Sequence, residues 1–185
     1  MKIKVVFGVI LSLILVLGGL GTLFYTEGNA KKAEEYIKKA NQETSSLYKE
    51  MEENLQFVQE NGTLAKLNED KIKKANNQYK KAAAALDKVP RGFRKNETEV
   101  LENASSKLDE IEDFQQAAII GKILDIQLHH VQTNEVTDEI ALLKTKLSYE
   151  NHKFSYVQNQ RIRDVFETVY GNKLKQLGNS LVADK

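Results

Sequence analysis

The chain contains no cysteine. A disulfide framework, a thiolate metal site and a cysteine nucleophile are therefore excluded. A lipoprotein anchor is excluded as well, because that anchor requires a cysteine just after the signal. The fold must depend on the packing of secondary structure alone.

The chain has only one proline, and its net charge is close to zero. Pro90 is the single proline, which permits long uninterrupted helices almost everywhere else. The 27 basic and 26 acidic residues leave a net charge of only +1. Because no overall positive field exists, we expect no nucleic-acid partner.

The one long apolar run extends from Val5 to Tyr25 and carries no charged residue. Its roughly 21 residues would extend about 31 Å as a helix, enough to cross the hydrocarbon core of a bilayer. We therefore predict a transmembrane helix that acts as a signal anchor and has the lipid bilayer as its partner.

Cleavage of this segment is the alternative. Lys2 and Lys4 precede the apolar run, as they do in both signal peptides and anchors. Apolar residues resume at 20–25, which favours a retained anchor, whereas a cut after Ala30 would release a secreted helical protein. The same two lysines predict a cytoplasmic N-terminus and an extracytoplasmic C-terminal domain in the cell membrane.

A helix is expected from Asn29 to about Glu60. Its stripe of small or apolar residues recurs with a period of 3.5, as in a coiled coil. The stripe consists of Ile37, Ala40, Thr44, Leu47, Met51, Asn54 and Val58. Gly62 ends this helix, and if Gly28 does not interrupt the chain, span and helix form one continuous rod.

A second helix is expected from Thr63 or Asn68 to Lys88, before Pro90. Its stripe consists of Ile72, Ala75, Tyr79, Ala82, Leu86 and Val89. The small alanines in this stripe predict a close approach to a neighbouring helix.

Two further helices complete the prediction. The third is capped by Asn96, and its section Ile119 to Val131 is expected to be the most buried part of the domain. The fourth begins at Thr137 and ends at Gly171. The fold class is all-α, with an N-terminal transmembrane helix followed by an antiparallel bundle of three to four long helices.

The predicted organisation has four parts. They are a cytoplasmic N-terminus at 1–4, the anchor at 5–25, the extracytoplasmic bundle at 29–171 and a short C-terminal tail at 172–185.

Charge is unevenly placed. The second helix and its following turn are basic, through Lys71, Lys73, Lys74, Lys80, Lys81, Lys88, Arg91, Arg94 and Lys95. The start of the third helix is acidic, through Glu97, Glu99, Glu102, Asp109, Glu110, Glu112 and Asp113. In a hairpin around Pro90 these charges would face each other; the alternative is that the basic helix binds phosphate groups of lipid or wall polymer.

No set of residues forms a recognisable catalytic or cofactor site. His129 and His130 point about 100° apart on a helix, so we expect them not to share one metal. His152 could join one of them only if the third and fourth helices pair in the right register. The acidic residues at 109–113 lack the spacing of a calcium loop and are interpreted as an exposed face. Tyr149, Phe154, Tyr156, Phe166 and Tyr170 are expected to pack in the core. We therefore predict no catalytic residue, no metal and no cofactor.

The layout, an apolar span at the N-terminus followed by a helical domain, resembles that of the LemA-type membrane proteins of bacteria. The arginine-rich segment containing Leu-Ile-Pro-Asn that marks those proteins has no counterpart between Asn29 and Asn61. The resemblance is one of layout, and no function or residue role is transferred from that family.

The combination of anchor, heptad-like stripes and absent active-site chemistry predicts a non-enzymatic scaffold or protein-interaction module at a bacterial envelope. Its partner would be another protein or a second copy. The alternative is a ligand-binding sensor-type domain, with a small molecule or metal held near Leu124 to Val131 and His152.

Overall fold

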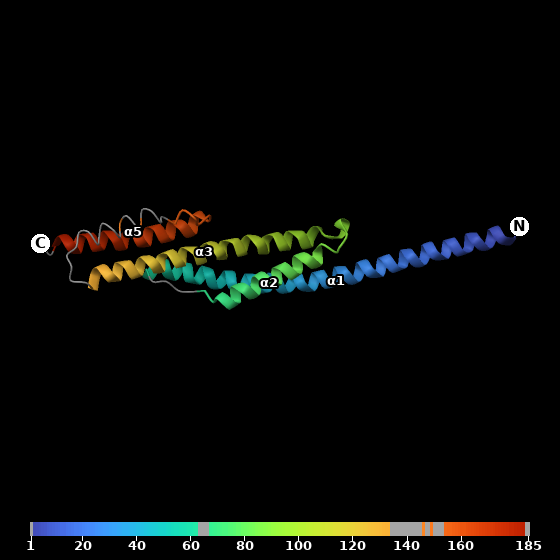
Figure 1. The fold of residues 1–185 in the computed structure, drawn as a ribbon, viewed down its shortest axis with the longest axis horizontal. Coiled ribbons are helices and arrows are strands. Elements are labelled where there is room, and N and C mark those ends of the chain that lie inside the picture. Colours follow the sequence, from blue (N-terminus) through green and yellow to red (C-terminus); the bar gives the residue numbers. More distant parts are fainter. Residues whose placement is uncertain (1, 63–66, 134–145, 147–148, 150–153, 184–185) are drawn as a thin grey trace. The chain divides into compact units, whose positions relative to one another are not determined.

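The protein is all-α over the residues that its structure, a computed structural model, describes: 2–62, 67–133, 146, 149 and 154–183. Side chains are described from residue 27 onward, except at 93, 95, 130–133 and 180–183. The elements are α1 (Lys2–Asn61), α2 (Glu69–Leu86), the 3₁₀ turn η1 (Arg91–Phe93), α3 (Lys95–Thr133) and α5 (Gln160–Ala183). Figure 1 shows these helices, and the described part contains no strand. The prediction of an all-α helical bundle is confirmed.

Two compact units divide the chain. Unit 1 comprises Met1–Glu43 and Lys74–Ser105, and unit 2 comprises Thr44–Lys73 and Ser106–Lys185. Helices α1, α2 and α3 each contribute residues to both units.

Unit 1 is built on small residues. Its core cluster consists of Ala33, Ile37, Ala40, Ala82, Leu86, Val89 and Leu101. Ala40 and Ala82 have no exposed surface, so the backbones of α1 and α2 approach closely there, as the alanine-rich stripe predicts. An ion pair of 2.6 Å between Glu43 of α1 and Lys74 of α2 adds a polar contact at the edge of this packing.

The turn between α2 and α3 is held by one arginine. The Arg94 guanidinium donates hydrogen bonds to the carbonyl oxygens of Val89 and, at 2.7 Å, Asp87. It also lies 3.5 Å from the Asp87 carboxylate. Because Pro90 prevents the helix from continuing, this side chain satisfies carbonyl groups of the turn that follows α2.

Two helix pairs of unit 2, α1 with α3 and α3 with α5, are parallel. Lys107 of α3 contacts Ser45 of α1 at 3.1 Å, and three residues further along both helices Glu110 contacts Tyr48 at 3.1 Å. Helices α1 and α3 therefore run in the same direction here. Likewise, Asp113 of α3 binds Asn159 just before α5, and Asp125, further along α3, binds Lys173 in the middle of α5. Helix α5 therefore runs in the same direction as α3, which Figure 1 also shows.

An aromatic cluster forms the core of unit 2. Phe114, Phe154, Phe166 and Tyr170 are each at most 1% exposed. The rings of Phe114 and Phe166 meet edge to face, with centroids 5.8 Å apart. Such aromatic packing contributes roughly 0.5–1.5 kcal/mol per pair beyond the burial of area, and here it joins α3 to α5.

Helix ends follow the predicted signals in two places. Helix α1 ends at Asn61 and is followed by Gly62 with φ +63°, the left-handed exit that glycine adopts without strain. Helix α2 begins after Asn68, whose side-chain oxygen accepts a hydrogen bond of 2.9 Å from the Asp70 amide. Gly28 does not interrupt α1, which is one helix of 60 residues.

Three predicted features are wrong. Helix α3 begins at Lys95, so Asn96 lies inside it and does not cap it. The predicted fourth helix is interrupted at residues 154–159, and Gly171 does not end α5, which continues to Ala183. Leu174 and Leu177 are buried beyond that glycine, and this packing outweighs the helix-ending tendency of Gly171. The predicted start at Thr137 lies outside the described residues.

Among the residues whose side chains are described, no helix has an apolar stretch long enough to cross a membrane. The predicted span from Val5 to Tyr25 lies outside those residues, although its backbone belongs to α1. The transmembrane segment therefore stays a prediction.

Candidate interaction surfaces

One face of α3 is exposed over more than four helical turns. Six residues at a 3-4-3-4-3 spacing make up this face, which we call the α3 seam: Asp109, Glu112, Gln116, Ile119, Ile123 and Ile126. Its C-terminal half is apolar, with Ile119 57%, Ile123 49% and Ile126 63% exposed. Its N-terminal half carries two carboxylates that form no ion pair within the described part of the chain.

The seam corrects a prediction. The sequence predicts that Ile119 to Val131 is the most buried section of the domain, but only part of this section is buried. Leu124 and Leu128 face the core of unit 2, while the three isoleucines of the seam face outward. This section of α3 thus has two apolar faces, and the described residues cover one of them.

Among the described residues, the basic residues of α2 do not form the ion pairs predicted with the acidic start of α3. Lys71 and Lys74 each form an ion pair of 2.6 Å with Glu50 and Glu43 of α1. Within the described residues no ion pair joins α2 to α3. The carboxylates of α1 lie closer because α1 and α2 cross at small alanines.

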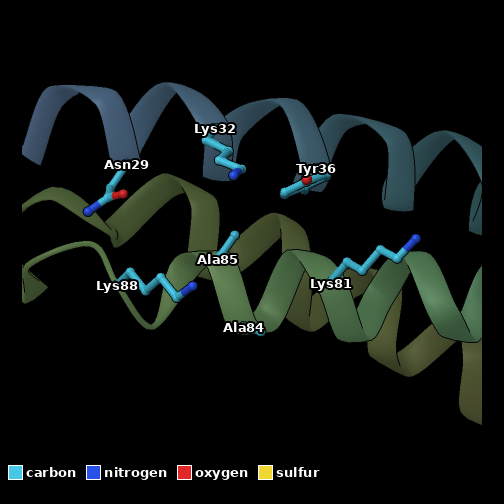
Figure 2. A pocket seen from close by; sticks show the side chains of 7 residues that line it. All are labelled: Asn29, Lys32, Tyr36, Lys81, Ala84, Ala85 and Lys88. Carbon is cyan, nitrogen blue, oxygen red and sulfur yellow. The ribbon is translucent and has the colours of Figure 1, made fainter. Parts of the chain in front are cut away.

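A pocket of about 310 Å³ lies between α1 and α2 in unit 1. It is lined by Asn29, Lys32, Tyr36, Lys81, Ala84, Ala85 and Lys88, which we call the lysine pocket. Figure 2 shows Lys32 extending from α1, Lys81 from α2 and Lys88 from the turn after α2. No acidic residue lines the pocket.

The lysines of the pocket, Lys32, Lys81 and Lys88, form no ion pair among the described residues, although, behind the larger effect of Lys39, Lys32 is close enough to help lower the pKa of Glu35. The nearby carboxylate of Glu35 is engaged by Lys39 at 2.8 Å. The side-chain nitrogen of Asn29 is buried and has no hydrogen-bond partner among the described residues.

The predicted metal candidates do not assemble in the described residues. His129 is exposed, the side chain of His130 is not described, and His152 lies outside the described residues. No group of three metal-ligating side chains occurs among the residues that the structure describes.

The acidic residues 109–113 are not one exposed face. Asp109 and Glu112 are exposed, but Asp113 is only 8% exposed and accepts hydrogen bonds from the backbone amides of Gln158 and Asn159, at 3.0 and 2.6 Å. Asp113 thus ties α3 to the segment that precedes α5. Its sequence neighbours are acidic too, so no local pattern distinguishes this residue.

The predicted aromatic core is confirmed with one exception. Phe154, Phe166 and Tyr170 are buried, and the hydroxyl of the half-buried Tyr149 donates to the Glu167 carbonyl at 3.2 Å. Tyr156 is 72% exposed because it lies in the turn before α5.

A polar network absent from the sequence prediction joins α1, α3 and α5 in unit 2. Arg161 donates to both carboxylate oxygens of Glu52, and Tyr48 donates to Glu110 at 3.1 Å. Hydrogen bonds from Arg161 hold the pKa of Glu52 below its usual value, although burial opposes this shift. Burial and the bond to Glu110 raise the pKa of Tyr48 to about 12. These four side chains form a structural contact, because each one satisfies the hydrogen-bonding capacity of another.

Comparisons of the chain with protein-family models, with curated proteins and with solved structures give no match. The α3 seam, the lysine pocket and the apolar run are the features of the chain that bear on its function.

Proposed function

We propose that this protein is a non-enzymatic interaction module, anchored in a bacterial cell membrane by Val5 to Tyr25, that binds a partner protein through the α3 seam. The observation that carries the proposal is the exposure of Ile119, Ile123 and Ile126 on one face of a long helix. Soluble surfaces rarely expose apolar side chains as an ordered row, and such rows are typical of helix-docking sites.

The charges of the seam define its partner. Asp109 and Glu112 lie at one end and the isoleucines at the other. A second copy aligned in parallel would place carboxylate against carboxylate, and an antiparallel copy would place carboxylates against isoleucines. Both arrangements are unfavourable, so the partner is a different protein. It presents an amphipathic helix with apolar residues at one end and lysine or arginine at the other.

The cysteine-free chain allows a clean crosslinking test. A photoreactive maleimide is attached to a single cysteine introduced by Ile123→Cys, in the full-length protein in its native membrane. The matched control is Lys122→Cys, which is exposed and adjacent on α3 but points about 100° away. We expect a product that contains one copy of this chain and a second protein from position 123 only.

Charge reversal makes this test specific. Asp109→Lys with Glu112→Lys, combined with Ile123→Cys, should reduce the yield at least about tenfold, because the partner's basic residues then meet lysines. An unchanged yield, or equal yields at positions 122 and 123, would overturn the proposed docking. A product of twice the 21.0 kDa mass would show that a second copy occupies the seam instead.

The anchor is tested by the intact mass and membrane fractionation of the full-length product. We expect a product of full-length mass in the membrane pellet, with its C-terminal region accessible to protease only from outside the cell. A soluble product that starts at Lys31 would contradict the anchor and indicate a secreted binding protein.

A further inference from the structure

The lysine pocket has the composition of an anion site. Lys32 of α1, Lys81 of α2 and Lys88 of the turn after α2 line it, and no acidic residue does. All three lysines are exposed, and positive charges that share one pocket repel one another. A bound anion would relieve this repulsion.

The buried side-chain nitrogen of the partly exposed Asn29 also bears on the pocket. This nitrogen has no partner among the described residues, and a buried donor without a partner is costly. Asn29 lines the pocket together with the lysines. A ligand oxygen in the pocket could accept its hydrogen bond.

We propose that the lysine pocket binds a phosphate group. Phosphate offers several strong acceptor oxygens and at least one negative charge, which match three ammonium groups and one amide. A carboxylate would satisfy fewer of these donors. The volume of about 310 Å³ also holds more than a bare phosphate, so an ester-linked group fits beside Ala84 and Ala85.

Two sources can supply this group. The pocket lies close to the predicted bilayer surface, because Asn29 follows Tyr25 by about 6 Å along α1. Basic pockets next to a membrane-spanning helix bind anionic headgroups. That source depends on the proposed anchor, whereas free phosphate or a soluble phosphate ester does not. Neither source depends on the α3 seam.

The test measures binding of defined probes to the full-length protein in a zwitterionic detergent. The probes are inorganic phosphate, pyrophosphate and short-chain phosphatidylglycerol, with short-chain phosphatidylcholine as the zwitterionic control. Isothermal titration provides the affinity. We expect saturable binding of at least one anionic probe and none of phosphatidylcholine.

A matched pair of triple variants locates the site. Lys32→Gln, Lys81→Gln and Lys88→Gln remove the three pocket charges and should weaken binding at least about tenfold. Lys38→Gln, Lys73→Gln and Lys80→Gln remove the same charge from exposed positions of the same helices outside the pocket and should change affinity less than about twofold. Circular dichroism checks that both variants keep their helices.

The outcomes separate the two sources and the two proposals. Tighter binding of phosphatidylglycerol than of phosphate and pyrophosphate indicates a lipid headgroup, and the reverse indicates a soluble phosphate compound. No binding of any anionic probe, or equal weakening by both triple variants, would overturn the phosphate site. Because the detergent-solubilised chain contains the pocket whether or not the anchor spans a membrane, such a failure would leave the proposed anchoring and docking unaffected.

Discussion

Tyr170 lies directly against Gly121. A Cβ atom at position 121 would be 2.7 Å from the tyrosine hydroxyl oxygen and 2.9 Å from ring atom Cε2. The ring cannot move away freely, because Tyr170 is 1% exposed and its hydroxyl donates to Asp125 at 2.8 Å. Lys173 fixes the same carboxylate at 2.6 Å. Glycine at 121 therefore allows α3 and α5 to approach at this point.

Gly121→Ala should destabilise the protein by about 1 to 3 kcal/mol, because a methyl group would force the buried ring to shift. Gly28→Ala is the control, since a Cβ at that helical position has no neighbour within 4 Å. The control should be neutral or stabilising by up to about 1 kcal/mol, because alanine favours the helix. Urea unfolding of the full-length protein in detergent measures both. Equal stabilisation by both substitutions would contradict the close contact.

The stability of unit 2 should fall at high pH. Burial and the hydrogen bond to Asp125 raise the pKa of Tyr170, and burial with the bond to Glu110 raises the pKa of Tyr48 to about 12. The unfolded chain releases these protons near pH 10, while the folded protein retains them, so the stabilising effect is complete below pH 10 and declines as the pH rises from 10 to 12.

Unfolding midpoints measured between pH 8 and 12 test this expectation. Tyr48→Phe and Tyr170→Phe remove the two ionisations and should flatten the profile over that range. Tyr156→Phe changes an exposed tyrosine and should leave the profile as in the wild type. A slope that persists in the double variant would show that other groups cause the decline.

Asp113→Ala should cost about 1 to 3 kcal/mol, because two backbone amides before α5 lose their acceptor. Asp109→Ala, an exposed carboxylate one turn earlier, should change stability by less than about 0.5 kcal/mol. Thermal unfolding compares the two variants. Similar losses would mean that net charge, and not the position of Asp113, determines the effect.

Thr44→Val should stabilise the protein by about 1 kcal/mol. The Thr44 hydroxyl is fully buried and has no partner among the described residues, so an apolar group of the same shape removes a desolvation cost. Thr98→Val should have the opposite sign, because the Thr98 hydroxyl donates to the Arg94 carbonyl at 2.8 Å. Chemical unfolding measures both, and a destabilised Thr44→Val variant would contradict the unpaired hydroxyl.

Local patterns in the sequence predict much of the helical framework. Six of the seven stripe positions predicted on α1 are buried, and the exception is Asn54, whose place in the core is taken by Leu55. The pattern shifts there because a helix of 3.6 residues per turn drifts relative to a period of 3.5. The turn at Gly62 and the cap at Asn68 were also predictable, since each depends on a few neighbouring residues.

The candidate surfaces were less predictable. Hydrophobicity alone does not show whether a second helix covers a given apolar face, so the isoleucines of the α3 seam looked like core residues. For the lysine pocket, the sequence showed only an excess of positive charge on α2 and the turn after it, and it did not predict a pocket. Which lysines meet α1 carboxylates and which remain unpaired depends on where α1 and α2 cross.

The sequence by itself determined the all-α class, the long helices and most of their buried faces, because helical periodicity, capping residues and a single proline act within one or two turns. Tertiary structure decided the rest: the role of Asp113, the approach of Tyr170 to Gly121, the continuation of α5 through Gly171, and the exposure of the α3 seam. Each of these depends on residues tens of positions apart, and their contacts arise only when the helices pack.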